Sequence, residues 1–236
     1  MKYSSMYGIR GNEDKIESSA GRERVLHEFL LLLVTILPLQ VIYPVLSGSA
    51  MERPLLVLFF SLILLSGVWI MRGSRRRFLM AAILTLVSLE LLWSSLWPAA
   101  APLLLLGEFC LLLLLFILVG RSIGTFIRTD LKISDLLLII AALFLLTGTT
   151  LGLSLYLLGS LYPVTGSGGP EIISLPGYLT AGISILTLQG AGTILSVHTP
   201  PLVRVVMNLG MIGGILLVIL AIGKVVIALQ NRNGAE

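Results

Sequence analysis

Residues 177–193 read GYLTAGISILTLQGAGT and lie between two long apolar stretches of the chain. The apolar part, from about Gly177 to Leu188, has only a dozen residues. It is too short to cross a bilayer, because a transmembrane helix needs roughly 20 residues, and it is too apolar for an ordinary loop. We therefore predict a re-entrant half-helix here, with Ser174 as its cap and Pro176 in its first turn.

The composition of the whole chain explains why such a segment is found here. The protein has 236 residues, of which 56% are hydrophobic and 12% are charged, and its mean hydropathy is +1.02. Soluble domains carry about one quarter charged residues, so this chain is expected to be an all-α integral membrane protein surrounded by the lipid bilayer. Its formal charge of +4 is too small to indicate a nucleic-acid partner.

Six stretches are long and apolar enough to span the membrane. Five of them meet this criterion cleanly, and one meets it slightly less well. They run from about Phe29 to Val45, Pro54 to Met71, Phe78 to Trp97, Pro102 to Val119, Leu136 to Leu161 and Val203 to Leu229. We divide the chain into a tail (1–26), a four-helix membrane domain (27–121), a pore-like domain (133–230) and a second tail (231–236).

Basic residues orient these spans. All lysines and arginines except Arg53 and Arg204 fall in segments that six spans place on one side of the membrane. Cytoplasmic loops are enriched in Lys and Arg, so both termini are predicted to be cytoplasmic. The half-helix then enters the membrane from the opposite side.

The glycine pair after the half-helix suggests a role for the backbone. Non-helical backbone persists at membrane depth only inside protein or beside water. Gly190 and Gly192 allow dihedral angles that point successive carbonyl groups the same way, as in a cation filter. The negative end of the half-helix dipole would favour a cation at the same place. We expect potassium or sodium as the permeant ion, with no other metal and no cofactor.

The segment from Tyr178 to Val226 resembles the pore region of the potassium channel superfamily, and in particular small bacterial six-span channels. That family has a pore helix, a T-T-L-G-Y-G-D filter, a proline turn with an arginine, and an inner helix with glycines. The resemblance implies a homotetramer in a prokaryotic plasma membrane, with an inner-helix hinge at Gly210, Gly213 or Gly214. The matching filter residues are Thr187, Leu188, Gln189, Gly190, Ala191, Gly192 and Thr193.

This segment departs from the family pattern at four positions. Leu188 replaces the threonine hydroxyl of the innermost ion site, and Gln189 replaces an apolar residue. Ala191 replaces the aromatic ring that braces the filter, and Thr193 replaces its aspartate. The departures predict weak or altered selectivity between potassium and sodium.

The first four spans carry few polar residues. The fourth span has no basic residue, which argues against voltage sensing by charge movement. Glu90 and Glu108 are acids well inside spans, so both are candidates for an intramembrane polar site. No nucleophile triad or pair of catalytic carboxylates can be assembled, so an enzyme is not expected.

Three functions remain open from the sequence. The first is a tetrameric cation channel. The second is a non-conducting scaffold or interaction protein on the same fold, and the third is a small secondary transporter that uses Glu108 and the broken segment. The inner-helix glycines also have an alternative role, in which they let the last span pack closely against Gly148 and Gly152 of the fifth.

Overall fold

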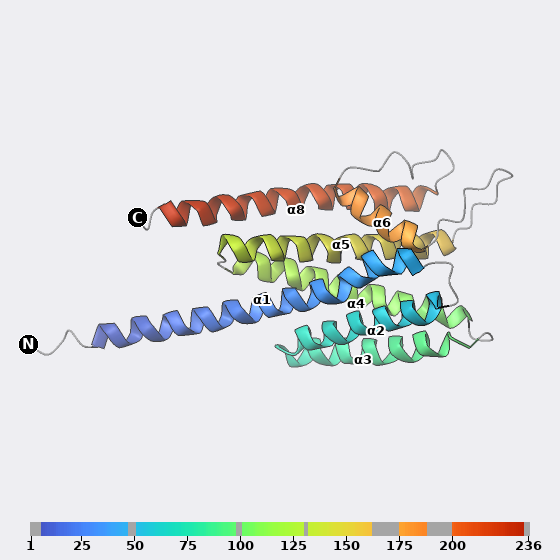
Figure 1. Ribbon diagram of the computed structural model, residues 1–236, viewed down its shortest axis with the longest axis horizontal. Helices are drawn as coiled ribbons and strands as arrows, with labels where there is room; N and C mark the ends of the chain where they lie inside the picture. Colours follow the sequence, from blue (N-terminus) through green and yellow to red (C-terminus); the bar gives the residue numbers. More distant parts are fainter. Residues whose placement is uncertain are drawn as a thin grey trace, which may run out of the picture.

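The computed structural model describes residues 6–46, 51–97, 101–129, 132–161, 175–187 and 200–233 (Figure 1). Every regular element within these ranges is an α-helix. Six of the helices are long and apolar enough to cross a membrane. The prediction of an all-α membrane protein with six spans is therefore confirmed at this level. The six helices are α1 (Met6–Leu46), α2 (Glu52–Met71), α3 (Arg75–Ser94), α4 (Ala101–Arg128), α5 (Ile133–Leu161) and α8 (Pro201–Asn233).

A seventh helix, α6 (Leu175–Leu186), has only 12 residues. It overlaps the predicted half-helix, about Gly177 to Leu188, and it is too short to span a bilayer alone. Seven of its residues are buried, so it is enclosed by protein along much of its length. These are Leu175, Pro176, Leu179, Ala181, Gly182, Ile185 and Leu186.

Two helices extend beyond the predicted spans. Helix α1 begins at Met6, inside the predicted cytoplasmic tail, although its apolar span covers only Gly21–Val45. Helix α4 continues past Val119 to Arg128. Hydropathy indicates where a helix leaves the lipid, but the helix itself can continue into water when polar side chains stabilise it. The i,i+4 ion pair Arg24–Glu28 stabilises α1 in this way.

The helices are arranged in a bundle, and the six long helices alternate in direction along the chain (Figure 1). Helices α6 and α8 lie on one side of the bundle, and α2 and α3 lie on the other. Helices α1, α4 and α5 lie between them and connect the two sides. We call α1–α4 the four-helix domain and α5, α6 and α8 the three-helix module.

One end of the bundle collects most of the described basic residues, and we call it the basic end. Arg22 of α1 pairs with Asp135 of α5 at 3.9 Å, and Arg121 of α4 pairs with Glu28 of α1 at 3.1 Å. Lys224 of α8 donates a hydrogen bond to the backbone oxygen of Thr129, at 3.2 Å. Segments that are far apart in the sequence therefore meet there, as the alternation of six spans predicts.

The apolar interior falls into two clusters of buried residues. The larger cluster joins all four helices of the four-helix domain to α5, and it also includes Leu175 and Leu179 of α6 and Leu217 of α8. The smaller cluster belongs to the three-helix module alone and consists of Leu151, Leu155, Ile185, Leu186, Val203 and Met207. The module thus has a core of its own around the short helix.

Candidate functional site

Helix α6 packs on α5 through glycine residues. A Cβ built on Gly152 would lie 2.7 Å from the Cα of Leu179, and one built on Gly148 would lie 3.2 Å from the Cα of Ile183. From α6, a Cβ on Gly182 would lie 2.8 Å from the Cα of Gly152. The two backbones therefore touch over about one helical turn of α5, which only residues without side chains permit.

Helix α6 also contacts α8, and here too glycine makes the contact. A Cβ on Gly214 would lie 2.9 Å from the Cα of Leu186 and would overlap its backbone oxygen. A Cβ on Gly210 would lie 2.5 Å from Leu151 of α5 and 3.3 Å from Ile185 of α6. The short helix is therefore held between two spans.

These contacts also fix the depth that α6 reaches. The side chain of Tyr178, in its first turn, reaches Gly159 near the end of α5. The backbone of Ile183, in its last turn, lies beside Gly148, which is about 16.5 Å from Gly159 along α5 at 1.5 Å per residue. Gly148 is near the midpoint of the 29-residue helix. Helix α6 therefore ends about half-way along the bundle.

Thr187 follows α6 at this half-way level, and its side chain is exposed in the single chain. Its hydroxyl donates to the backbone oxygens of Ile183 at 3.1 Å and Ser184 at 3.3 Å. The other predicted filter residues, Leu188, Gln189, Gly190, Ala191, Gly192 and Thr193, lie outside the described residues, as does the proposed cap Ser174. The description resumes at Pro200, immediately before α8.

The three glycines of the predicted hinge have different surroundings. Gly210 and Gly214 face α5 and α6, whereas a Cβ on Gly213 would meet nothing within 4 Å. The alternative in which the last span packs against Gly148 and Gly152 is wrong. Helix α6 packs against both glycines instead. Helix α6 occupies that face of α5, and α8 packs on α6 as well as on α5.

An apolar groove of about 440 Å³ runs beside this contact, between α4, α5 and α8. Gly213 lies on its wall, together with Phe109 and Phe116 of α4 and Leu209 of α8. Thr147 also lines the groove, and its hydroxyl oxygen has no hydrogen-bond partner among the described residues. The groove explains why Gly213 has space around it.

The two candidate acids are placed differently. Glu108 of α4 is 0% exposed, and neither of its carboxyl oxygens has a hydrogen-bond partner in the described part of the chain. Glu90 of α3 is exposed and borders a surface hollow with Trp93 and Trp97. The carboxyl of Glu108 lies within electrostatic range of Tyr43 of α1 and Tyr156 of α5.

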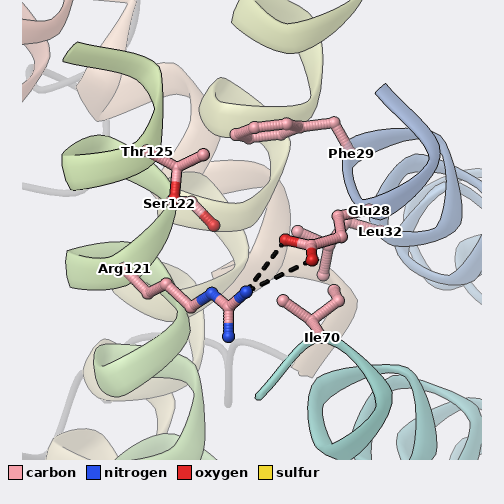
Figure 2. A pocket seen from close by; sticks show the side chains of 7 residues that line it. All are labelled: Glu28, Phe29, Leu32, Ile70, Arg121, Ser122 and Thr125. Atoms are coloured by element: carbon pink, nitrogen blue, oxygen red, sulfur yellow. Dashed lines mark hydrogen bonds and ion pairs between the residues drawn. The ribbon is translucent and has the colours of Figure 1, made fainter. Parts of the chain in front are cut away.

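At the basic end, Glu28 and Arg121 form a partly buried ion pair (Figure 2). One guanidinium nitrogen of Arg121 donates to both carboxylate oxygens of Glu28, at 3.2 and 3.1 Å. A cavity of about 10 Å³ beside the pair is large enough for at most one water molecule, so it is no ligand site. Its wall includes Ser122 and Thr125 of α4 and Ile70 of α2 (Figure 2).

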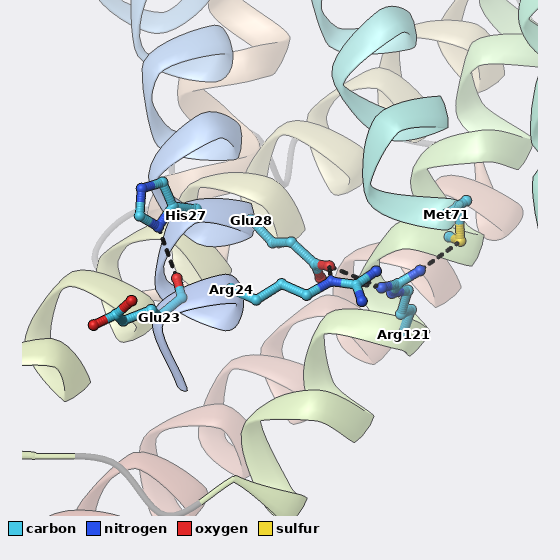
Figure 3. A network of polar contacts seen from close by, with 6 residues as sticks. All are labelled: Glu23, Arg24, His27, Glu28, Met71 and Arg121. Atoms are coloured by element: carbon cyan, nitrogen blue, oxygen red, sulfur yellow. Dashed lines mark hydrogen bonds and ion pairs between the residues drawn. The ribbon is translucent and has the colours of Figure 1, made fainter. Parts of the chain in front are cut away.

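Neighbouring groups extend this pair into a network (Figure 3). Arg24 lies 3.4 Å from Glu28, and Arg121 also approaches the sulfur of Met71 at 3.7 Å. His27 is bonded at 2.8 Å to the backbone oxygen of Glu23, so it belongs to α1 rather than to the pair (Figure 3). The network ties α1, α2 and α4 together, a structural role that the sequence alone did not suggest.

Within the described residues, no group of three or more His, Cys, Asp and Glu side chains could hold a metal ion. Comparison of the chain with protein-family models, with curated proteins and with solved structures found no match. Function must therefore be inferred from the geometry of the chain itself. The two most informative features are the short helix that ends at mid-bundle and the buried acid Glu108.

Proposed function

We propose that the protein is a potassium-channel-like membrane protein that assembles as a homotetramer and conducts monovalent cations. In this proposal α6 is a re-entrant pore helix, and residues 187–193 line the ion path. Potassium or sodium is the permeant ion, and selectivity between them is weak. Both termini lie in the cytoplasm, at the basic end of the bundle, and the membrane is a prokaryotic plasma membrane.

One observation carries this proposal. A 12-residue helix, wedged between two spans by backbone contacts at glycines, ends half-way along the bundle. The last carbonyl groups of a helix carry a partial negative charge, which at this depth favours a cation. Thr187 follows α6 and Pro200 precedes α8, and in this proposal the segment between them is the pore loop.

A second observation supports assembly from several copies. Helix α8 is the least buried of the six long helices, with only 17% of its span window buried inside one chain. Its exposed side chains include Leu209, Ile212, Leu216 and Ile219. One half-helix per chain cannot enclose an ion, whereas four copies around an axis next to α6 and α8 can.

The decisive experiment is ion flux into liposomes that contain the purified protein. Potassium and sodium gradients are tested separately, and liposomes without a gradient serve as the control. We expect protein-dependent flux of both ions. Correctly folded protein without flux would contradict conduction and leave the non-conducting scaffold on the same fold.

Selectivity and assembly are tested by two further measurements. The reversal potential under mixed potassium and sodium is expected to follow both ions, because Leu188 and Ala191 supply neither the hydroxyl nor the ring that the family filter has. A potential that follows potassium alone would contradict this prediction. Native mass spectrometry in mild detergent is expected to show a tetramer, and a monomer would count against the shared path.

A further inference from the structure

The carboxyl group of Glu108 is surrounded by protein on all sides. The side chain is 0% exposed, and both oxygens lack a hydrogen-bond partner among the described residues. Its neighbour Gly107 packs against Leu92 of α3, and the Gly107 carbonyl accepts a hydrogen bond from Ser88 at 2.8 Å. An ionised carboxylate in such a place would carry an uncompensated charge, and its desolvation costs several kcal/mol.

The surroundings of Glu108 do not supply a counter-ion. None of the described salt bridges includes it. A metal cation takes several oxygen ligands, and the described residues contain no group of three or more ligating side chains. A proton, in contrast, needs only one carboxyl oxygen. The chemistry of the site therefore selects a proton as its ligand.

Polar groups lie around Glu108 on each neighbouring helix. Helix α1 contributes Tyr43, and α5 contributes Tyr156. At the start of α2, Glu52 accepts a hydrogen bond from Tyr43. Helix α3 contributes the hydroxyl of Ser88, which is already bonded to Gly107.

Tyr43 makes its hydrogen bond toward the end of the bundle opposite the basic end rather than toward Glu108. Its side chain is buried, with 1% exposed, and its hydroxyl donates to Glu52 at 3.1 Å. Glu52 lies in the first turn of α2 and is partly exposed. On the other side, the ring of Tyr156 meets the ring of Tyr178 of α6 edge to face, with centroids 5.9 Å apart.

We propose that Glu108 is a proton-binding site inside the four-helix domain. The bound proton keeps the buried side chain neutral. When the proton leaves, the charge appears beside Tyr156, which contacts the short helix α6. The proposal goes beyond ion conduction and does not depend on it, because its tests need no flux.

Infrared spectroscopy of the purified protein in lipid bilayers tests the bound proton directly. Solvent-exposed glutamates are ionised at pH 7, whereas a protonated carboxylic acid has a separate carbonyl band. We expect this band in the wild type at pH 7, its loss in Glu108→Gln, and its retention in Glu90→Gln. Absence of the band in the wild type, or its persistence in Glu108→Gln, would overturn the proposal. Glu108→Asp shifts the band and provides a second variant if the amide does not fold.

Thermal unfolding at several pH values gives an independent readout. The native protein binds a proton that the unfolded chain releases, so the stability of the wild type falls relative to Glu108→Gln as pH rises. A difference between the two proteins that does not change with pH would contradict the site.

Discussion

The three-helix module and the four-helix domain are both apolar, but their helices are held together by different contacts. In the module, backbones touch at Gly148, Gly152, Gly182 and Gly214. In the four-helix domain, side chains make most of the contacts. Examples are Trp93 donating to Ser61 at 3.2 Å and Arg121 pairing with Glu28 at 3.1 Å.

This difference has a physical consequence. Lipid is as apolar as leucine, so helices in a membrane are held by close packing and polar contacts rather than by the hydrophobic effect. A backbone contact cannot adjust when a methyl group is inserted, whereas a side chain can rotate away. The module is therefore expected to tolerate far less change than the four-helix domain, and the module contains the proposed pore.

The largest effect is expected for Gly182→Ala. The new methyl group would overlap the backbone oxygen of Gly148 and lie 2.8 Å from the Cα of Gly152. Inserting a methyl group into such a contact costs about 3 kcal/mol. We expect a large loss of folded protein and a lower melting temperature, measured by size exclusion and thermal unfolding. A wild-type melting temperature would show that α6 is not held as rigidly as its contacts imply.

The next largest effect is expected for Gly214→Ala in α8, and it contrasts with the effect of alanine at the adjacent Gly213. Gly214→Ala would place a methyl group on the backbone of Leu186 and is expected to destabilise the protein by about 2 kcal/mol. Gly213→Ala meets open space, so its stability is expected to equal or exceed that of the wild type, since alanine favours a helix by up to about 1 kcal/mol.

The same pair of variants also tests the hinge. If Gly213 is the point at which α8 bends, the open probability changes in Gly213→Ala although stability does not fall. Single-channel recording measures this effect. Unchanged gating in stable Gly213→Ala tetramers would remove the hinge at this position and leave Gly210 and Gly214 as packing residues.

A smaller effect is expected for Glu28→Gln in the four-helix domain. The change removes the negative charge between Arg24 and Arg121, each of which pairs with it. A hydrogen bond to a charged group contributes about 2 kcal/mol, so a loss of this size or less is expected in thermal unfolding. Glu23→Gln is the control, because Glu23 is exposed and its backbone oxygen makes its described contact. Equal melting temperatures for both variants would contradict a stabilising network.

The smallest effect is expected for Gly67→Ala of α2. Its methyl group would meet the side-chain ends of Leu118 at 3.0 Å and Leu114 at 3.1 Å, which can rotate. We expect a loss of about 1 kcal/mol or less in thermal unfolding, well below that of Gly182→Ala. A loss as large as that of Gly182→Ala would erase the distinction between the two regions.

Much of the fold can be predicted from the sequence, because the bilayer imposes simple rules on length and hydropathy. The six spans and the short helix follow from runs of apolar residues in a chain of few charges. The ends of α1 and α4 do not, since a helix can continue into water where no hydropathy signal marks its end. A spacing signal was present in α8, where Gly210 and Gly214 are four residues apart and share a face.

The partners of the helix faces could not be predicted in this way. Gly148 and Gly152 marked a face for close packing, but α6 rather than α8 occupies it. Glu90 and Glu108 were both candidates, and the packed structure shows that Glu90 is exposed and Glu108 is buried.

The sequence by itself determined that lipid surrounds the chain, how many spans it has, and that α6 is too short to be one of them. It could do so because the thickness and low polarity of a bilayer act on each segment separately. The tertiary structure alone decided which glycines contact the backbone of another helix, how far along the bundle α6 extends, and which glutamate is buried. Those properties depend on which helix lies opposite a given face. Which helix packs there depends on close packing among segments far apart in the chain, and no local sequence pattern predicts it.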